Sequence, residues 1–429
     1  MSVDRGHLAG IVAVGDELLA GAHPDLNSPH LASHLAEHGR HVVRVTVVAD
    51  DEEAIAEAIS DLADRAPLVI ATGGLGPTLD DLTRHGAARA AGVPLVHSSE
   101  AWDQIRVWYA RAGRDMPDSN ERQALVPQAA EVLENPIGTA PGFRVPVGSS
   151  TLFVLPGPPA ELAAMVERHL LPWLVANPVG HEAFGVRRFH LFDLSESVFA
   201  DRAGGWMERG TNPLMGVTVK GGILSVKLVA RGRDDAEVGR LLGESGAAFR
   251  ERFGAHVFSE TSPDIALAVG EELLARRLSV ATAESCTGGL VAGALTRVPG
   301  ISALFHEGFV TYSNEAKSAR LGVSPELLAQ HGAVSEEVAQ AMARGVAERT
   351  GARLSIAVTG IAGPSGGSPE KPVGLVWFGL SLDGRSVTRS RRWPASGRDR
   401  VREWATAKAL SLLLRAARGE IEFPAEGAG

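Results

Sequence analysis

The sequence predicts an α/β protein in which a small α+β module joins two doubly wound α/β domains. Apolar strands alternate with amphipathic helices toward each end of the chain, and this alternation breaks near residues 172–185. A chain of 429 residues is also too long for one ordinary hydrophobic core. We therefore expect domains over residues 1–178, 179–256 and 262–424.

In the first domain, Leu8–Val14, His41–Val48 and Pro67–Thr72 are apolar, rich in β-branched residues and bounded by charged or glycine-rich turns, which predicts strands. Between the last two, Asp51–Arg65 repeats apolar residues at helical spacing. Strand and helix alternating in this way predict a parallel sheet whose ligands bind at the carboxyl ends of the strands.

The remaining elements follow from the same patterns. In the middle module we expect strands at Phe189–Leu191, Gly216–Val219 and Leu224–Val229, helices at Glu196–Asp201 and Asp234–Arg252, and a linker at His256–Pro263. In the last domain we expect strands at Leu278–Ala283, Leu354–Val358 and Val373–Leu380, and helices at Asp264–Arg276, Leu290–Arg297, Glu336–Thr350 (capped by Ser335) and Gly397–Arg418.

The composition narrows the class of partner. Net charge is −9, and the first 180 residues hold 12 Arg, no Lys and 23 Asp or Glu, which disfavours binding to nucleic acid or to an anionic membrane. The single cysteine excludes an intrachain disulfide and favours a reducing compartment. No apolar run approaches the roughly 20 residues of a membrane span, so we expect a cytoplasmic protein with no membrane partner.

The segment Ala283–Gly289 places Ser285, Cys286 and Thr287 where a strand should turn into a helix. Free backbone N–H groups at a helix start form a cradle for a phosphate or an oxyanion, so the segment predicts acyl transfer or hydrolysis. An isolated serine at such a junction is more often a helix cap. A thiol is the stronger nucleophile, and spacing alone does not separate Ser285 from Cys286.

Two further loops accompany this segment, Tyr312–Lys317 and Thr359–Gly374. A lysine can serve as general base when burial lowers its pKa, and the chain retains only five lysines against 37 arginines. Tyr312 is a candidate relay for the proton that reaches the leaving group. The residues expected to bind substrate are Thr287, Gly288, Gly289, Asn314, Thr359, Gly360, Gly363 and Lys371, the last as a possible phosphate ligand.

On these three loops the chain resembles the CinA family of competence- and damage-inducible proteins. The resemblance implies a C-terminal amidohydrolase domain that converts nicotinamide mononucleotide to nicotinic acid mononucleotide and ammonia without a cofactor. It also implies Ser285 as nucleophile, with Lys317 and Tyr312 beside it, and the likeness favours a homodimer.

A second motif, Thr72–Thr83, is neither a Rossmann fingerprint nor a P-loop. Its glycines let backbone N–H groups approach a phosphate, and the adjacent Asp80 and Asp81 can hold a bridging divalent metal such as Mg²⁺. We expect the nucleotide site to comprise Asp16, Glu17, Asn27, Gly73, Gly74, Gly76 and Thr78.

These residues, with Gly138–Gly142 and Leu155–Glu161, resemble the MoaB/Mog-type molybdopterin-binding fold found at the N-terminus of CinA proteins. That resemblance implies metal-dependent cleavage of ADP-ribose. Because the same fold also handles molybdopterin, a pterin-binding or adenylating enzyme is an alternative, and a non-enzymatic competence or recombination partner is another. The middle module is described in this family as KH-like, yet it lacks a basic Gly-x-x-Gly loop, so we expect a spacer or a dimerisation element.

Overall fold

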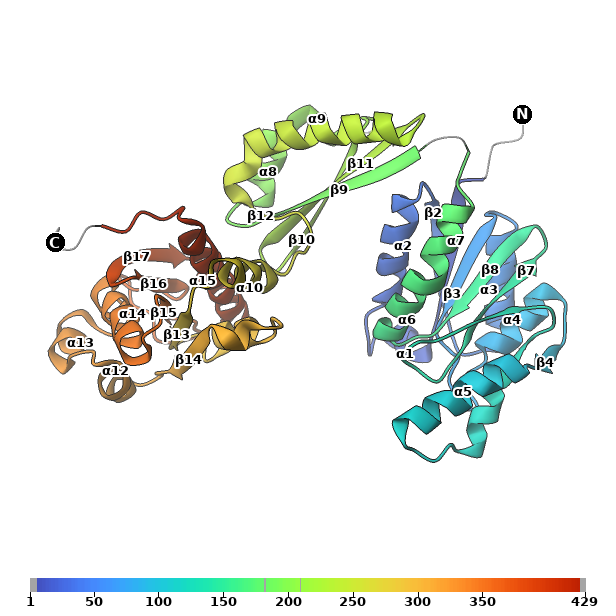
Figure 1. Cartoon of the computed structure of the whole chain (residues 1–429), viewed down its shortest axis with the longest axis horizontal. Helices are drawn as coiled ribbons and strands as arrows, with labels where there is room; N and C mark the ends of the chain where they lie inside the picture. Colours follow the sequence, from blue (N-terminus) through green and yellow to red (C-terminus); the bar gives the residue numbers. More distant parts are fainter. Residues whose placement is uncertain (1–5, 181–182, 209, 425–429) are drawn as a thin grey trace. The chain divides into compact units, whose positions relative to one another are not determined.

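The computed structural model of the protein describes residues 6–180, 183–208 and 210–424 (Figure 1). The chain divides into two units, one formed by residues 1–186 with 229–241 and the other by residues 187–228 with 242–429. Within the described ranges, no helix has both the length and the apolar character that crossing a membrane requires.

A six-stranded sheet in the order β2-β1-β3-β8-β7-β6 forms the centre of the first unit. The first four strands run parallel, as predicted, and β7 and β6 add an antiparallel edge that the alternation did not indicate. In chain order the strands are β1 (Leu8–Val14), β2 (His41–Val48), β3 (Leu68–Thr72), β6 (Glu131–Leu133), β7 (Gly142–Val147) and β8 (Ser150–Leu155).

Helices cover both faces of this sheet. Asp51 caps α3 by accepting a hydrogen bond from the Ala54 amide, and α3 buries Ile55, Ile59 and Leu62 against the sheet. One face packs against α3 (Glu52–Ala63) and α4 (Thr83–Ala91), and the other against α2 (Asn27–Glu37), α6 (Pro159–Met165) and α7 (Leu171–Ala176). The short α1 (Asp16–Leu19), the helix α5 (Ser99–Ala112) and the two-stranded sheet of β4 (Leu95–His97) and β5 (Leu125–Pro127) complete the domain.

The middle module has a four-stranded sheet in the order β10-β11-β9-β12. The prediction of a linker at His256–Pro263 was partly wrong. Val257 pairs with Leu191, so this segment supplies an edge strand of the sheet. The elements are β9 (Ala183–Leu191), α8 (Glu196–Ala203), β10 (Leu214–Lys220), β11 (Ile223–Gly232), α9 (Asp235–Phe253) and β12 (Val257–Ser259).

The last domain contains a five-stranded sheet in the order β14-β13-β15-β16-β17. The strands β14, β13 and β15 run parallel, whereas β16 and β17 are antiparallel. Their bounds are β13 (Val280–Glu284), β14 (Phe305–Val310), β15 (Leu354–Gly360), β16 (Leu375–Leu382) and β17 (Arg385–Arg392).

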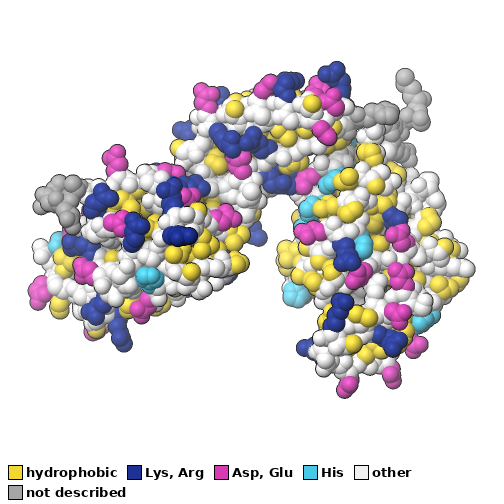
Figure 2. Space-filling model, in the orientation of Figure 1, with side chains coloured by type: hydrophobic (Ala, Val, Ile, Leu, Met, Phe, Trp, Pro, Cys, Tyr) yellow, Lys and Arg dark blue, Asp and Glu magenta, His cyan; other side chains and the backbone are white. Residues whose placement is uncertain are grey.

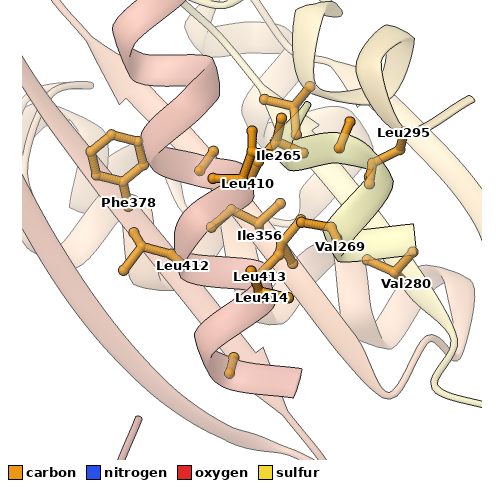
Figure 3. Packing of buried hydrophobic residues seen from close by; sticks show 14 of the residues in the cluster. Ile265, Val269, Val280, Leu295, Ile356, Phe378, Leu410, Leu412, Leu413 and Leu414 are labelled. Atoms are coloured by element: carbon orange, nitrogen blue, oxygen red, sulfur yellow. The ribbon is translucent and has the colours of Figure 1, made fainter. Parts of the chain in front are cut away.

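This sheet is also covered on both faces. One face packs against α10 (Ile265–Arg276), α11 (Leu290–Thr296) and α15 (Arg398–Arg418), and the other against α12 (Asn314–Leu321), α13 (Pro325–His331) and α14 (Glu336–Thr350). Figure 3 shows Val269 of α10 and Leu413 of α15 packed with Ile356 of the sheet, all fully buried. Burial of such side chains stabilises the fold by about 1.5–3 kcal/mol each.

The middle module and the last domain share this core. Phe192 and Phe258 of the module belong to the same buried cluster as α10 and α15, and Lys408 of α15 pairs with Asp193. On the face drawn in Figure 2, basic, acidic and apolar side chains are interspersed.

Candidate active sites

Ser285 follows β13, which lies between β14 and β15 in the last domain's sheet. Its amide donates to the Val358 carbonyl of β15 (2.9 Å), which holds the backbone in place directly after the strand. Ser285 is only 9% exposed. Ser285 is therefore a buried hydroxyl at the carboxyl edge of a parallel sheet, where ligands of α/β folds bind.

Lys317 lies beside Ser285 although 32 residues separate them. Its Nζ is 3.1 Å from Ser285 Oγ, and it also donates to the carbonyls of Thr311 (2.9 Å) and Tyr312 (3.3 Å). Ser313 caps α12 by accepting from the Ala316 amide and so positions the helix that carries the lysine. Lys317 is 1% exposed, and this burial lowers the pKa of its amine, so the neutral form that can accept a proton becomes accessible.

The backbone amides expected to bind a phosphate at the start of α11 are already hydrogen-bonded within the chain. The buried Glu284 carboxylate accepts from the amides of Gly289 (3.0 Å), Val291 (3.1 Å) and Ala292 (2.8 Å). The Gly288 amide donates to the Ser285 carbonyl (3.1 Å). The prediction that Gly288 and Gly289 hold an anion through their amides was therefore wrong, because a carboxylate of the chain already neutralises this helix terminus.

Two other amides remain available next to the serine. In the described part of the chain, the N–H groups of Cys286 and Thr287 donate to no backbone or side-chain acceptor of another residue. The Thr287 hydroxyl is buried and, within the described residues, likewise has no hydrogen-bond partner. These groups follow Ser285 directly, so they are the donors closest in sequence to an oxyanion formed on its substrate.

The Tyr312 side chain does not take the predicted position. Tyr312 is 59% exposed, and its hydroxyl accepts a hydrogen bond from Arg398 rather than bonding to Ser285 or Lys317. Only its backbone carbonyl contacts the Lys317 amine. The structure therefore assigns the Tyr312 hydroxyl to a contact with α15 and not to a proton relay.

Two predicted ligands in the third loop instead brace the structure. The buried Thr359 hydroxyl donates to the Ala333 carbonyl (2.7 Å), and the Lys371 amine donates to the His331 carbonyl. Both side chains tie neighbouring loops together, which corrects their assignment as substrate ligands.

The other predicted ligands remain open to solvent or shape the loop backbone. Asn314 is exposed in the first turn of α12. Gly360 pairs with Val376 in the sheet. Gly363 has φ +86°, and a side chain there would lie 2.7 Å from Val373, so the turn needs glycine.

Sequence reasoning missed two arginines at the start of α15. Arg398 bridges the Tyr312 hydroxyl and the Gly363 carbonyl (2.8 Å), and Arg402 donates to the carbonyls of Cys286 and Thr287 (both 3.2 Å). No sequence signal distinguished them among 37 arginines, because their contacts join positions 35 to 116 residues apart.

Cys286 is expected to be chemically inert. It is 5% exposed, and burial raises the pKa of its thiol to about 12, so the thiolate is scarce at neutral pH. We expect Cys286→Ala to change kcat/KM for an amide substrate by less than about threefold, and iodoacetamide at pH 7.5 to leave the native protein unlabelled by mass spectrometry. Rapid alkylation that removes activity would make the thiol a competitor of Ser285.

The first domain has its own cavity, of about 540 Å³, at the carboxyl ends of β1 and β3. Asn27 reaches across it and donates to the Thr72 hydroxyl (3.0 Å) and the Gly157 carbonyl (2.7 Å). Gly73 has φ +103°, and a side chain there would lie 2.2 Å from the Val14 carbonyl. Of the predicted nucleotide-site residues, the cavity is lined by Glu17, Asn27, Gly73 and Gly74, together with the predicted metal ligands Asp80 and Asp81.

Asp81 does not act as a free metal ligand. Its carboxylate accepts from the amides of Gly76 (2.8 Å) and Thr78 (2.7 Å) and from the Thr78 hydroxyl, so these three predicted residues brace one another. Among the residues described, no three His, Cys, Asp or Glu side chains are grouped so that they could hold a metal ion. Asp81 is therefore engaged within the loop, and a divalent metal held by Asp80 and Asp81 together with a substrate phosphate stays a prediction.

Two residues of this site escaped the sequence prediction. Asp50 accepts a hydrogen bond from the Asp16 amide (2.9 Å), and burial raises the pKa of its carboxyl, with the charges of Asp16, Glu17 and Asp80 adding to the shift. Arg84 is buried under the glycine loop and donates to the Leu75 carbonyl (2.7 Å); burial lowers the pKa of its guanidinium to about 10.

Fold and sites together define a three-part α/β protein with a molybdopterin-binding-like first domain and a buried Ser–Lys pair in the last. Family models match each part: "Probable molybdopterin binding domain" over residues 10–176, "Damage-inducible protein CinA KH domain" over 186–259 and "CinA C-terminal domain" over 263–417.

Relatives extend the likeness to nearly the full chain. A competence-damage inducible protein of Symbiobacterium thermophilum is 43% identical, and the alignment covers 95% of this chain and 98% of that protein. A CinA-like protein of Geobacter metallireducens is 41% identical over 94% of this chain and 98% of its own length. The chain belongs to the CinA family, which confirms the resemblance.

Proposed function

We propose that the C-terminal domain hydrolyses the carboxamide of nicotinamide mononucleotide to nicotinic acid mononucleotide and ammonia. The observation that carries this proposal is the 3.1 Å contact between Lys317 Nζ and Ser285 Oγ in a buried environment. An amide is a poor electrophile, so its attack by serine requires a base and an oxyanion site, and both are adjacent to Ser285.

The reaction runs through an ester on Ser285. Neutral Lys317 accepts the hydroxyl proton as Oγ attacks the amide carbon, and the amides of Cys286 and Thr287 donate to the resulting oxyanion. The C–N bond then breaks as Lys317 returns the proton to the nitrogen, which leaves as ammonia. Water attacks the ester with Lys317 again accepting a proton, and collapse releases the carboxylic acid and restores Ser285.

The phosphate of the substrate requires cationic donors outside α11, because Glu284 closes the amides of that helix. Arg398 and Arg402 contact all three motif loops and present guanidinium groups suited to phosphate oxygens. We assign phosphate recognition to Arg398, because Arg402 already pairs with Asp399 and donates to two carbonyls.

The direct experiment incubates the purified protein with nicotinamide mononucleotide and measures ammonia by a coupled assay and the acid product by chromatography. We expect equal amounts of both products without any added metal or cofactor. A wild-type protein that forms neither product overturns the proposed function.

For the first domain we propose binding of a nucleotide phosphate and cleavage of ADP-ribose. The support is the 540 Å³ cavity lined by Gly73, Gly74 and carboxylates. Assays of ADP-ribose with Mg²⁺ and with a chelator test this activity. Tight pterin binding without cleavage under any divalent metal favours the molybdopterin-handling alternative instead.

The roles of the two neighbouring aspartates in this site are separable. We expect Asp81→Asn to speed amide exchange at Gly76 and Thr78 about tenfold or more, since the loop loses acceptors worth about 1–3 kcal/mol. Asp80→Asn should leave this exchange unchanged and lower ADP-ribose cleavage. Hydrogen exchange of peptides covering residues 72–84 makes the comparison, and equal exchange in the two variants contradicts the bracing role.

A further inference from the structure

The stretch from Arg385 to Arg402 is strongly basic in an otherwise acidic chain. Its 18 residues contain seven arginines and one acidic residue, Asp399, whereas the whole chain carries −9. The stretch forms β17, the connection after it and the first turns of α15. Positive charge is therefore concentrated in one part of the last domain, whereas the chain as a whole is negative.

Strand register places one end of β17 at the same edge of the sheet as the serine. Across the sheet, Glu284 pairs with Val358, Val358 with Phe378, and Phe378 with Arg389. Three strand spacings of about 4.8 Å put the Arg389 backbone roughly 14 Å from the residue that precedes Ser285. Arg391 pairs with Val376, which pairs with Gly360 at the start of the third loop.

The opposite end of β17 is remote from the site. Arg385 pairs with Leu382, and Leu382 pairs with Leu354, the first residue of β15. Because β15 runs parallel to β13, this end lies at the amino edge of the sheet, away from Ser285. The same strand thus carries arginines near the site and a natural control far from it.

The arginines near the site are not neutralised by neighbours. Arg389, Arg391, Arg392 and Arg400 are exposed, and none of them takes part in an ion pair among the described residues. The one acidic residue of the stretch, Asp399, pairs with Arg402 (3.4 Å). The charges of Arg389, Arg391 and Arg392 are therefore exposed on the half of β17 that lies toward the carboxyl edge of the sheet.

We infer that Arg389, Arg391 and Arg392 form a steering rim that attracts phosphate-bearing substrates to the Ser285 site and discriminates against analogues without a phosphate. The inference rests on the proposed amidohydrolase function and adds its specificity. Distances of this order are comparable with the Debye length, about 10 Å at 0.1 M salt, so the attraction acts at low ionic strength and is screened as salt rises. The phosphate of the substrate is attracted by this field, whereas a nicotinamide nucleoside without phosphate carries only the positive pyridinium ring and is not attracted.

The test compares Arg389→Gln/Arg391→Gln with a matched control, Arg385→Gln/Arg349→Gln. Arg349 is exposed in the last turn of α14, which leads into the amino end of β15, so both pairs remove two charges from one domain. At about 20 mM salt we expect the rim pair to lower kcat/KM for nicotinamide mononucleotide about 3- to 10-fold, with kcat unchanged and the difference under about twofold at 300 mM. The control should match wild type at both salt concentrations.

Nicotinamide riboside, which lacks the phosphate, supplies the second arm. Its turnover should be slow, and because its pyridinium ring is positively charged, loss of the rim arginines should not lower it at any salt concentration. A rim pair with the wild-type salt profile overturns the steering rim while leaving the proposed function intact. If wild type forms no ammonia, the proposed function fails, and calorimetric binding of nicotinamide mononucleotide against salt still decides the rim: equal affinities in both double variants overturn it.

Discussion

Replacement of Ser285 by alanine is expected to lower kcat/KM for nicotinamide mononucleotide by at least about 10³-fold, because the ester intermediate no longer forms. The hydroxyl is small and its neighbours are held independently of it: the Ser285 amide bonds to Val358, and Lys317 bonds to two carbonyls. We therefore expect the variant to fold and to bind the mononucleotide with wild-type affinity. Ammonia release and calorimetric titration measure the two properties.

The matched control is Ser324→Ala. Ser324 caps α13 by accepting from the Leu327 amide, so its loss should cost about 1 kcal/mol of stability without affecting turnover. If Ser285→Ala retains more than a tenth of the wild-type rate, a nucleophilic role for this serine is wrong. Substrate attack by an activated water, or by Cys286, would then have to be considered.

Replacement of Lys317 is expected to have the second largest effect, a loss of about 10²- to 10⁴-fold, the range of general acid–base catalysis. Lys317→Met removes the base and keeps an unbranched side chain, whereas Lys317→Arg keeps a cation that does not lose its proton. Both variants should be inactive. An active Lys317→Arg protein contradicts the base assignment.

The pH dependence distinguishes the two protonation states of this amine. Burial lowers the pKa of Lys317 below its ordinary value of 10.5, and only the neutral amine accepts a proton. The wild-type kcat/KM should therefore rise with pH along one ionisation whose midpoint lies below 10.5 and then level off. A rate that falls with pH through this region would show that the charged amine is the active form.

The same shift has a consequence for stability. Because the folded pKa lies below the unfolded value, the unfolded chain binds more protons in the interval between the two. The contribution of Lys317 to the free energy of unfolding is therefore unfavourable below the folded pKa and is relieved as pH rises through the interval. A buried amine whose protonation weakens the fold is consistent with a functional role.

Sequence pattern was most informative where an apolar run is bounded by turn residues. The expected bounds of β1 and β2 match the structure to the residue, since both are apolar, β-branched runs bounded by charged or glycine-rich turns. The strand β17 gave no such signal, because an exposed edge strand of arginines and serines has no apolar alternation. The strand β12 was mistaken for a linker because its three residues are too few to show a strand pattern.

The candidate site shows the same division. Ser285 and Lys317 were identifiable because each lies in a local motif whose residue types suit amide hydrolysis. The predictions for Gly288, Gly289, Tyr312, Thr359, Lys371 and Asp81 placed each residue near its site but did not foresee its hydrogen-bond partner. A hydrogen bond is set by distance and direction between two groups, and spacing along the chain specifies neither.

By itself, therefore, the sequence determined the alternation of strands and helices, the family and the two loops that carry the serine and the lysine. The tertiary structure alone decided that the Glu284 carboxylate accepts hydrogen bonds from the first amides of α11 and that Arg398 and Arg402 reach the motif loops. It alone also decided that Lys317 is buried. Periodicity and turn chemistry are properties of neighbouring residues, whereas desolvation and charge pairing depend on which distant segments the folded sheet brings together.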